Sequence, residues 1–369
     1  MTQVEDSSNV KDALAQIATQ LKKEWKNKKI PGLSAAIIYD QSTIWADSYG
    51  YANQEQEFPA TSQTLYSVAS ITKPVTATLM MHLRDAGKLQ LDDPLEKHLP
   101  GFKVKSRLSN IRPPTLRQVA AHVSGLPAEA PLDYRETWNW PPIEEILESI
   151  KDIELIAPPQ TKFQYSNLGY ALLGHVMERI SGLPYAECVK ECIFQPLGMK
   201  NSTFEDLWGC QNNPQVALGY TGDEGELAEP YIPPWDSFRA FIPVGGLWST
   251  AEDLARFVSF QFSEGAVGGK QVLSYSTLKE MHAPVFVLPD WSGGLAIGWS
   301  VGPVANHTTV RFEGSNAGYH ARIQFVPDLK IGVVILTNRF LGLDGMWPLV
   351  YSALEHLIPA VKHTLNNGV

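Results

Sequence analysis

Apolar residues near the start of the chain recur at helical spacing. Over residues 8–28 they fall at positions 10, 14, 17, 21 and 25, which share one face of an α-helix. Pro31-Gly32 ends this pattern. Two strand-like runs follow, residues 33–40 and 43–52, on either side of a short polar turn at Gln41-Ser42, which predicts an antiparallel hairpin.

A second group of strand-like runs lies near the other end of the chain. Four runs of similar length are separated by Gly, Pro or Asn, at residues 296–304, 307–314, 319–327 and 331–338. A helical pattern over Met346–His363 follows the last of them.

The middle of the chain is mostly helical in pattern. Helices are expected at Ile71–Ala86, Thr115–His122, Ile143–Lys151 and Leu168–Ser181, and after an N-cap at Thr250 as far as Phe262. Strands at both ends with helices between them predict an α/β (α+β) fold whose mainly antiparallel sheet is built from both termini. We expect a single domain over residues 1–369, with a sheet lobe at about 1–66 and 245–369 and an inserted helical lobe at about 70–240.

Charge and composition exclude several classes of protein. Thirty Lys and Arg against 39 Asp and Glu give a net charge of −9, which argues against nucleic acid as a partner. No run approaches the roughly 18 apolar residues of a membrane span, and no basic amphipathic stretch suggests a membrane surface. The N-terminus has no secretory signal pattern, and three cysteines are too few for a disulfide framework. These features predict a cytoplasmic protein; the oligomeric state is left open.

The first chemical signal is Ser70-Ile71-Thr72-Lys73 at the start of a predicted helix. Side chains three apart on a helix can touch, and a serine hydroxyl needs an adjacent base to act as a nucleophile. A lysine serves as that base only if its pKa falls, and the apolar residues around Lys73 favour the burial that lowers it. The start of the helix also places positive dipole charge near an oxyanion on Ser70.

Two further signals lie far along the chain. Tyr165-Ser166-Asn167 precedes a predicted helix, where a tyrosine can relay a proton and an asparagine can hold a carbonyl. The segment Phe312–Tyr319, with the sequence FEGSNAGY, lies between two strand-like runs, and its glycines allow close approach of the backbone to a substrate.

These three motifs, in this order, resemble those of the serine β-lactamase and penicillin-binding-protein superfamily, whose first motif is Ser-x-x-Lys. The Tyr-x-Asn second motif is similar to that of the class C β-lactamase-related group, which includes family VIII carboxylesterases. Other stretches resemble the same group, namely HVSGLP at His122–Pro127, FQPLGM at Phe194–Met199 and GGLWSTAEDLARF at Gly245–Phe257.

The resemblance implies a role for each matching residue. Ser70 would be the acylated nucleophile, and Lys73 and Tyr165 would share the base and proton-shuttle work. Asn167 would face the substrate or Lys73. The backbone N–H groups of Ser70 and Ser315 would form the oxyanion hole. The sequence leaves open which of Lys73 and Tyr165 takes the serine proton.

The third motif departs from the family pattern. Where β-lactamases have Lys-Thr-Gly, this chain has Phe312-Glu313-Gly314, so the cation that helps to seat a substrate carboxylate is missing. This change favours neutral esters, although Glu313 could instead attract a substrate ammonium if it points into the cleft. His320 is a candidate for the cleft wall. The flanking arginines that could replace the missing cation are Arg311, Arg322 and Arg339.

The sequence therefore predicts a serine hydrolase that acts on short esters, as a carboxylesterase or acyl transferase. The alternatives are a D-amino-acid peptidase or amidase, a weak β-lactamase, and a non-catalytic sensor that is acylated but does not turn over. Gly298-Trp299-Ser300-Val301-Gly302 matches a nucleophile elbow, but a strand-like run follows it where that elbow requires a helix. No metal or nucleotide motif is present, so no metal and no cofactor is expected. The aromatic-rich stretches 134–142 and 231–241 are either packed loops or the walls of an acyl pocket.

Overall fold

The computed structural model describes residues 3–367 except 106–110, 138, 152, 211, 223–227, 235–236, 265–270, 317 and 343–344. Within these residues the dominant feature is a nine-stranded sheet in the order β3-β2-β1-β13-β12-β11-β10-β9-β8, in which every pairing is antiparallel. Its strands are β1 Gly32–Tyr39, β2 Ser42–Asn53, β3 Phe58–Pro59, β8 Phe286–Val287, β9 Gly294–Leu295, β10 Ser300–Val304, β11 His307–Asn316, β12 Tyr319–Val326 and β13 Ile331–Thr337. Two small sheets pair β4 (Tyr66–Ser67) with β7 (Trp248–Ser249), and β5 (Gly219–Thr221) with β6 (Glu229–Tyr231).

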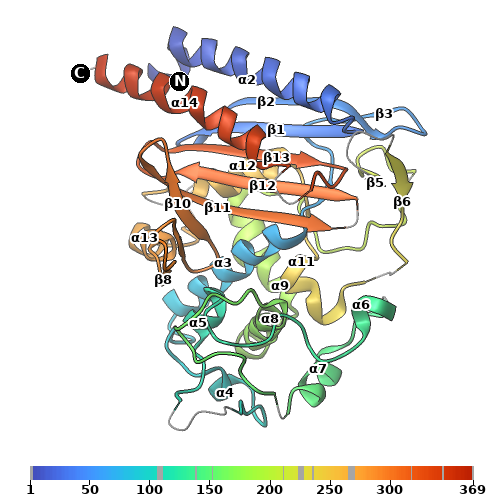
Figure 1. Cartoon of the computed structure of the whole chain (residues 1–369), viewed down its shortest axis with the longest axis vertical. Coiled ribbons are helices and arrows are strands. Elements are labelled where there is room, and N and C mark those ends of the chain that lie inside the picture. The colour runs from blue at the N-terminus through green and yellow to red at the C-terminus, as the bar shows by residue number, and fades with distance from the viewer. Residues whose placement is uncertain are drawn as a thin grey trace.

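The two ends of the chain meet at the centre of the large sheet. β1 pairs with β13 from Leu33↔Thr337 to Tyr39↔Ile331, so strands about 300 residues apart are neighbours. Figure 1 shows the blue and orange strands lying side by side. The predicted α/β fold with an antiparallel sheet formed by both termini is therefore confirmed.

The sheet separates two hydrophobic cores, which explains why its central strands are apolar along their whole length. Alternate residues of β1 face opposite sides, because Ala36 and Ile38 belong to one core and Ala35 and Ile37 to the other. The helices α2 (Ser8–Asn27) and α14 (Trp347–Asn367) cover the second core. Figure 1 shows these two helices packed together over one face, where the short α1 (Gln3–Asp6) also lies against them, and helices such as α3 (Thr72–Asp85), α8 (Asn167–Ser181) and α12 (Ala251–Phe260) beyond the opposite face.

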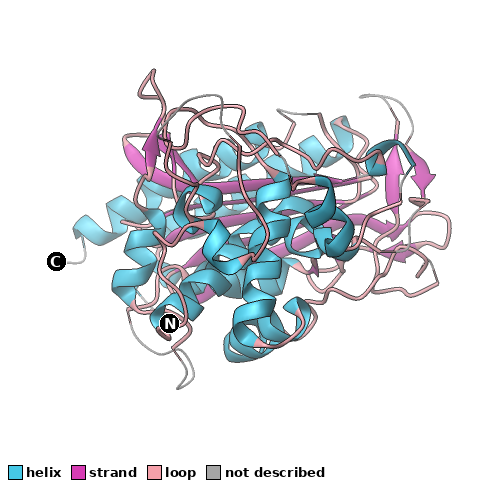
Figure 2. Ribbon diagram, turned by 90° about the horizontal axis from the view of Figure 1, so that it is seen from below, coloured by secondary structure: helices cyan, strands magenta, loops and turns pink. Residues whose placement is uncertain are grey.

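The predicted helices are present, with ends that differ by a few residues. Figure 2 shows how the helices of the first core cover the sheet when seen from below. The helices not yet given are α4 Leu95–His98, α5 Leu116–Ala120, α6 Tyr134–Thr137, α7 Ile143–Ser149, α9 Tyr185–Val189, α10 Gln195–Leu197, α11 Ile242–Gly245 and α13 Tyr275–His282, with 3-10 turns η1 Ala69–Ile71 and η3 Arg239–Phe241 and a π-helical turn η2 Lys190–Phe194.

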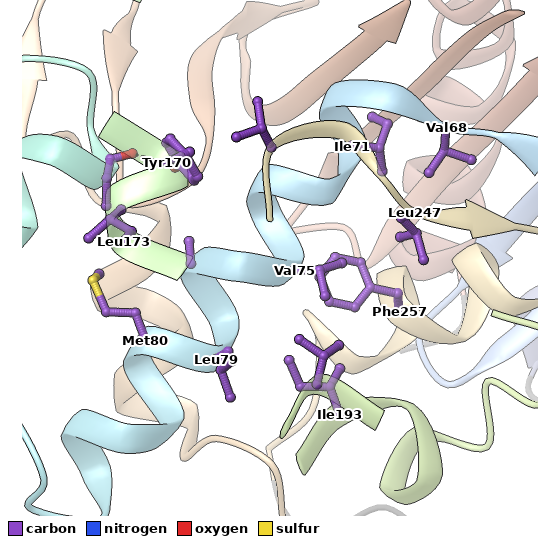
Figure 3. Close-up of a cluster of buried hydrophobic side chains, with 14 of the residues drawn as sticks. Val68, Ile71, Val75, Leu79, Met80, Tyr170, Leu173, Ile193, Leu247 and Phe257 are labelled. Carbon is purple, nitrogen blue, oxygen red and sulfur yellow. Dashed lines mark hydrogen bonds between the residues drawn. The ribbon is translucent and has the colours of Figure 1, made fainter. Parts of the chain in front are cut away.

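The helix α3 runs through the first core and is buried on nearly every side. Its apolar residues Val75, Leu79 and Met80 are at most 1% exposed and pack among residues from α8, α12 and the turn before α3 (Figure 3). An amphipathic surface helix would leave one face exposed, whereas every residue of α3 from Thr72 to Met81 is buried. Any charged side chain in the first turns of α3 therefore lies in an apolar environment. Lys73 is such a side chain.

Some of the smaller sequence predictions are tested directly by this structure. Ser300 lies in strand β10, as its context predicted, and Thr250 caps α12 by accepting the Asp253 N–H at 3.1 Å. The three cysteines are unpaired thiols, and Cys188 is buried.

No helix in the described part of the chain is long and apolar enough to cross a membrane. Within the same residues, no cluster of three or more His, Cys, Asp or Glu side chains is placed to hold a metal ion.

Candidate active site

Ser70 lies in a strained turn at the start of α3. The preceding residue, Ala69, has a φ of +47°, a left-handed conformation that is unfavourable for a residue with a Cβ. The Thr72 hydroxyl holds the turn, because it donates to the Ala69 carbonyl at 2.7 Å and accepts the Leu247 N–H at 3.1 Å. Strain of this kind persists only where the surroundings fix it, which is typical of a functional turn.

Lys73 lies one helical turn after Ser70 and is fully buried. Its Nζ contacts Ser70 Oγ at 2.9 Å and donates to the Val244 carbonyl of α11 at 3.1 Å. Burial lowers the pKa of Lys73 from 10.5 to about 7; the negative charge of Glu129 acts against this shift and the positive charge of Arg135 adds to it. A lysine with this pKa is partly unprotonated at neutral pH and can accept a proton.

Tyr165 reaches the same hydroxyl from the loop before α8. Its OH lies 2.9 Å from Ser70 Oγ, and Lys73 Nζ lies 4.8 Å from the centre of its ring. Burial raises the pKa of Tyr165 to about 12, despite the hydrogen bond with Ser70, which lowers it. The phenol is therefore protonated at neutral pH, and the three side chains that the sequence singled out meet at Ser70 Oγ.

His122 holds the loop that carries Tyr165. Its ring lies 4.4 Å from the Tyr165 ring, and its Nδ1 accepts the backbone N–H of Ser166 at 3.1 Å. Ser166 in turn caps α8, since its hydroxyl accepts the Gly169 N–H at 2.9 Å. Burial lowers the pKa of His122 well below its usual value, so the ring is neutral. These contacts give His122 a structural role in holding the loop that carries Tyr165.

Asn167, the first residue of α8, has a partner that the sequence did not reveal. Its Nδ2 donates to Glu129 Oε1 at 2.7 Å, and the Tyr134 hydroxyl donates to Glu129 Oε2 at 2.6 Å. Arg135 also forms an ion pair with Glu129. Glu129 lies two residues after the family-like segment His122–Pro127, and that proximity in sequence is the signal that could have identified it.

The strand β11 lies directly beside the turn that carries Ser70. A Cβ on Gly314 would lie 2.2 Å from the Val68 carbonyl oxygen and 2.7 Å from the Ser70 nitrogen, so only glycine fits there. Phe312 shares the face of Gly314 and packs against the first core. The two residues thus face the catalytic side, as expected. The assignment of the Ser315 N–H to an oxyanion hole stays a prediction.

Glu313 and His320 do not line the site, contrary to the sequence prediction. Successive strand residues point to opposite faces, so Glu313 is turned away from the side that Gly314 presents to Ser70. On that far face Glu313 accepts from His320 Nε2 at 2.6 Å and pairs with Arg322, which lies over Trp347 of α14. The Glu313 hypothesis required a side chain that points into the cleft, and alternation along β11 turns it away. His320 is paired with Ser315 across the ladder and lies on the same far face.

The flanking arginines do not supply the missing cation. Arg311 and Arg322 share the face of Glu313, and both guanidinium groups lie against the Trp347 ring. Arg339 is 2% exposed and donates to the carbonyls of Lys29 and Gly222. The catalytic side of β11 therefore presents Phe312 in place of the lysine of the family motif.

The two aromatic-rich stretches pack on one another. The Tyr134 ring lies 4.8 Å from that of Phe241 and 5.2 Å from that of Trp140, and Phe238 lies 4.9 Å from Trp140. Tyr134, Phe238 and Phe241 are all less than 9% exposed. These residues therefore form packed loops. Their cluster also fixes the Tyr134 side chain, whose hydroxyl donates to Glu129.

Known proteins of one family are similar to this chain over most of its length. Residues 14–351 match the Beta-lactamase family. The chain belongs to this family. Beta-lactamase-like protein 2 of Dictyostelium discoideum is 30% identical over 98% of this chain, and Penicillin-binding protein 4 of Amycolatopsis lactamdurans is 28% identical over 84% of it. The chain spans 65% and 81% of the lengths of these two proteins, and 63% of Beta-lactamase-like protein 4 of Dictyostelium discoideum.

Solved structures show the same fold. The octameric penicillin-binding protein homologue from Pyrococcus abyssi superposes with a TM-score of 0.79 at 29% identity, covering 94% of this chain and 77% of that one. EstCE1, described as a hydrolase with promiscuous acyltransferase activity, gives a TM-score of 0.78 at 23% identity and covers 94% of this chain and 98% of its own. The β-lactamase and penicillin-binding-protein fold is thus confirmed.

Proposed function

We propose that this chain is a serine hydrolase that cleaves short esters through an acyl-Ser70 intermediate. The observation that supports this best is the contact of Ser70 Oγ with Lys73 Nζ and Tyr165 OH, each at 2.9 Å. A hydroxyl placed between a group that can accept a proton and one that can relay it has the arrangement needed for nucleophilic catalysis.

The two pKa values favour Lys73 as the base. Lys73 has a pKa of about 7 and is partly neutral at physiological pH, whereas Tyr165, at about 12, keeps its proton. Lys73 then accepts the serine proton, and Tyr165 gives its own proton to the leaving alcohol. The proton held by Lys73 next moves to Tyr165, so both groups are restored before the second displacement. The two groups share one hydroxyl, so their titrations are coupled.

The reaction proceeds in two displacements. Ser70 Oγ bonds to the ester carbonyl carbon as its proton passes to Lys73, and the bond from that carbon to the alcohol oxygen breaks when the alcohol receives a proton. Water or a second alcohol then loses a proton to the same base and attacks the acyl carbon. The bond to Ser70 Oγ breaks, and the serine regains its proton. Backbone N–H groups near Ser70, with that of Ser315 as a candidate, stabilise the oxyanion in both halves.

Phe312 supports esters over β-lactams as the substrate class. It takes the place of the cation that seats a substrate carboxylate in the family, and the arginines near it in sequence lie elsewhere. A neutral acyl ester requires no such cation. Hydrolysis and transfer to an alcohol use the same acyl-enzyme and differ only in the second acceptor.

The test is hydrolysis of p-nitrophenyl butyrate by the wild type, by Ser70→Ala and by Ser300→Ala, with nitrocefin as a parallel substrate. We expect ester turnover that Ser70→Ala abolishes and Ser300→Ala retains, with little nitrocefin cleavage. Added methanol should divert part of the product to the methyl ester if the enzyme transfers acyl groups.

The other results separate the alternatives. Ester turnover that survives Ser70→Ala would overturn Ser70 as the nucleophile. Rapid nitrocefin cleavage with slow ester cleavage would identify a β-lactamase. A Ser70 adduct that persists without turnover would favour the sensor.

A further inference from the structure

A carboxylate that the proposed mechanism does not use lies beside the second motif. Glu129 accepts hydrogen bonds from Asn167 at 2.7 Å and from Tyr134 at 2.6 Å, and its side chain is still 25% exposed. Tyr134 is buried among the aromatic residues of two loops, so the carboxylate is held on a rigid support. A fixed, partly exposed negative charge next to the catalytic residues is a feature that a substrate can recognise.

The hydrogen bond to Glu129 fixes the orientation of the Asn167 amide. An ionised carboxylate only accepts, so the amide must present its NH₂ group to Glu129 and turn its oxygen away. That oxygen, Asn167 Oδ1, is buried and has no hydrogen-bond partner among the described residues. A buried acceptor without a donor is unfavourable, so the site favours a ligand that brings an N–H.

The ion pair that occupies Glu129 is open to exchange. Arg135 pairs with Glu129, but its side chain is 61% exposed, and ion pairs of such exposed side chains contribute little stability. A substrate cation can therefore displace Arg135, or share the carboxylate with it, at small cost. Tyr134 and Asn167 would keep Glu129 in place during the exchange.

Glu129 lies on the side of the site where the acyl part of a substrate would bind. Its partner Asn167 is two residues from Tyr165, whose hydroxyl lies 2.9 Å from Ser70 Oγ. The charge of Glu129 also acts on the pKa of both Lys73 and Tyr165, so Glu129 lies near the two residues that contact Ser70 Oγ. We therefore place the acyl substituents of a carbonyl carbon attacked by Ser70 on this side of the site. A group one bond from that carbonyl is the part of the substrate best placed to approach Glu129.

We propose that Glu129 binds an ammonium group on the acyl part of the substrate, while Asn167 Oδ1 accepts an N–H from the same group. This inference rests on the proposed function and narrows its substrate class to amino-acyl esters. It assigns to Glu129 the role that the sequence had suggested for Glu313, which lies on the other face of the sheet.

Three methyl esters of one shape and different charge test this directly. Alanine methyl ester in both enantiomers carries an ammonium, methyl isobutyrate is its neutral isostere, and the monomethyl ester of methylmalonic acid is its anionic isostere. Each kcat/KM is divided by the rate constant for hydroxide hydrolysis of the same ester, which removes intrinsic reactivity. We expect the order cation, neutral, anion in the wild type, for at least one enantiomer.

The variant Glu129→Gln can still accept from Asn167 but lacks the charge. We expect its preference for the cationic over the neutral ester to fall by about tenfold or more, the size of effect typical of one lost charge-assisted hydrogen bond. Glu136→Gln is the matched control, because Glu136 is exposed and adjacent to Arg135 in α6. It should leave the preference unchanged.

The outcomes distinguish this inference from the proposed function. Ser70-dependent turnover without a preference for the cation, or with a preference that survives Glu129→Gln, overturns the role of Glu129 and leaves the esterase intact. A preference for the anionic ester would show that Arg135, and not Glu129, recognises the charge of the substrate. This result would also overturn the role of Glu129. Absence of Ser70-dependent turnover for every ester, p-nitrophenyl butyrate included, would overturn both. If Glu129→Gln does not fold, the order of the three esters with the wild type decides.

Discussion

Charged side chains are buried on both sides of the sheet, but they differ in whether an opposite charge pairs with them. On the catalytic side Lys73 is fully buried, and among the described residues it forms no ion pair; its pKa falls to about 7. On the opposite side Glu313 is paired with His320 and Arg322. Burial alone would raise the pKa of Glu313, but those two partners lower it below its usual value.

Whether a buried charged group is reactive or structural depends on its partners. A buried charge without an opposite charge gives up its ionised form and becomes a base, whereas a paired charge stays ionised and holds the fold together. Nearness in sequence to a catalytic motif does not decide the matter, because Glu313 is adjacent to Gly314 and still lies on the structural side.

Replacing Lys73 by methionine should have the largest effect. Loss of a general base typically costs about 10²–10⁴-fold in rate, so we expect kcat/KM for p-nitrophenyl butyrate to fall by at least about a hundredfold. Steady-state kinetics of Lys73→Met against wild type measures this. A fall of less than about tenfold would contradict the role of Lys73.

The same variant tests the pKa through stability. Between about pH 7 and pH 10 the unfolded chain binds a proton on Lys73 that the folded chain has released, so wild-type stability from this residue rises with pH. Wild type should gain up to about 1.4 kcal/mol per pH unit relative to Lys73→Met in that range. Urea unfolding of both proteins at about pH 7 and about pH 9 measures the change, and a constant difference would show that Lys73 is not titrating there.

Gly314→Ala should have the next largest effect on activity. The added Cβ would overlap the Val68 carbonyl and the Ser70 nitrogen, so the strand or the Ser70 turn must move. A displacement of about 1 Å at the reacting atoms can cost about a hundredfold in rate. Kinetics and thermal unfolding should show activity falling more steeply than stability. Full activity would mean that β11 does not contact the Ser70 turn as described.

Glu313→Gln should have the smallest effect on activity and a clear effect on stability. The change leaves the buried Arg322 and His320 without their carboxylate, which we expect to cost about 1–3 kcal/mol of unfolding free energy. Ester kcat/KM should stay within about twofold of wild type, since Glu313 faces away from Ser70. A large loss of activity in a folded Glu313→Gln protein would mean that the two faces are not independent.

Much of the fold could be predicted from the sequence because its signals are periodic and local. The strand runs near both ends, the helix over residues 8–28 and the Thr250 cap each follow from spacing or from one hydrogen bond. That strands from both ends share one sheet could be predicted from their order along the chain, but the pairing of β1 with β13 could not, because it depends on contacts between residues about 300 apart. Residues 235–236, in the aromatic-rich stretch 231–241, and residue 317, in the third motif, lie outside the described part of the chain, so nothing tests the predictions there.

The site was predicted only as far as its motifs extend. Ser70 and Lys73 meet because they are three residues apart across η1 and the first turn of α3, and the family resemblance is what added Tyr165 to them in the prediction. Glu129 was missed because its partner Asn167 lies 38 residues away, a contact that no local pattern encodes. His320 was misplaced because a strand residue beside a motif can face either side of the sheet, and the face depends on register.

The most direct test of Ser70 as the nucleophile is to find where the acyl group is bound during turnover. Wild-type protein is mixed with p-nitrophenyl butyrate, quenched in acid within the first turnovers, digested and analysed by tandem mass spectrometry. We expect butyrylation of the peptide that contains Ser70, and of no other serine peptide. Rapid turnover with the acyl group on Ser300, or on no residue, would contradict the acyl-Ser70 mechanism.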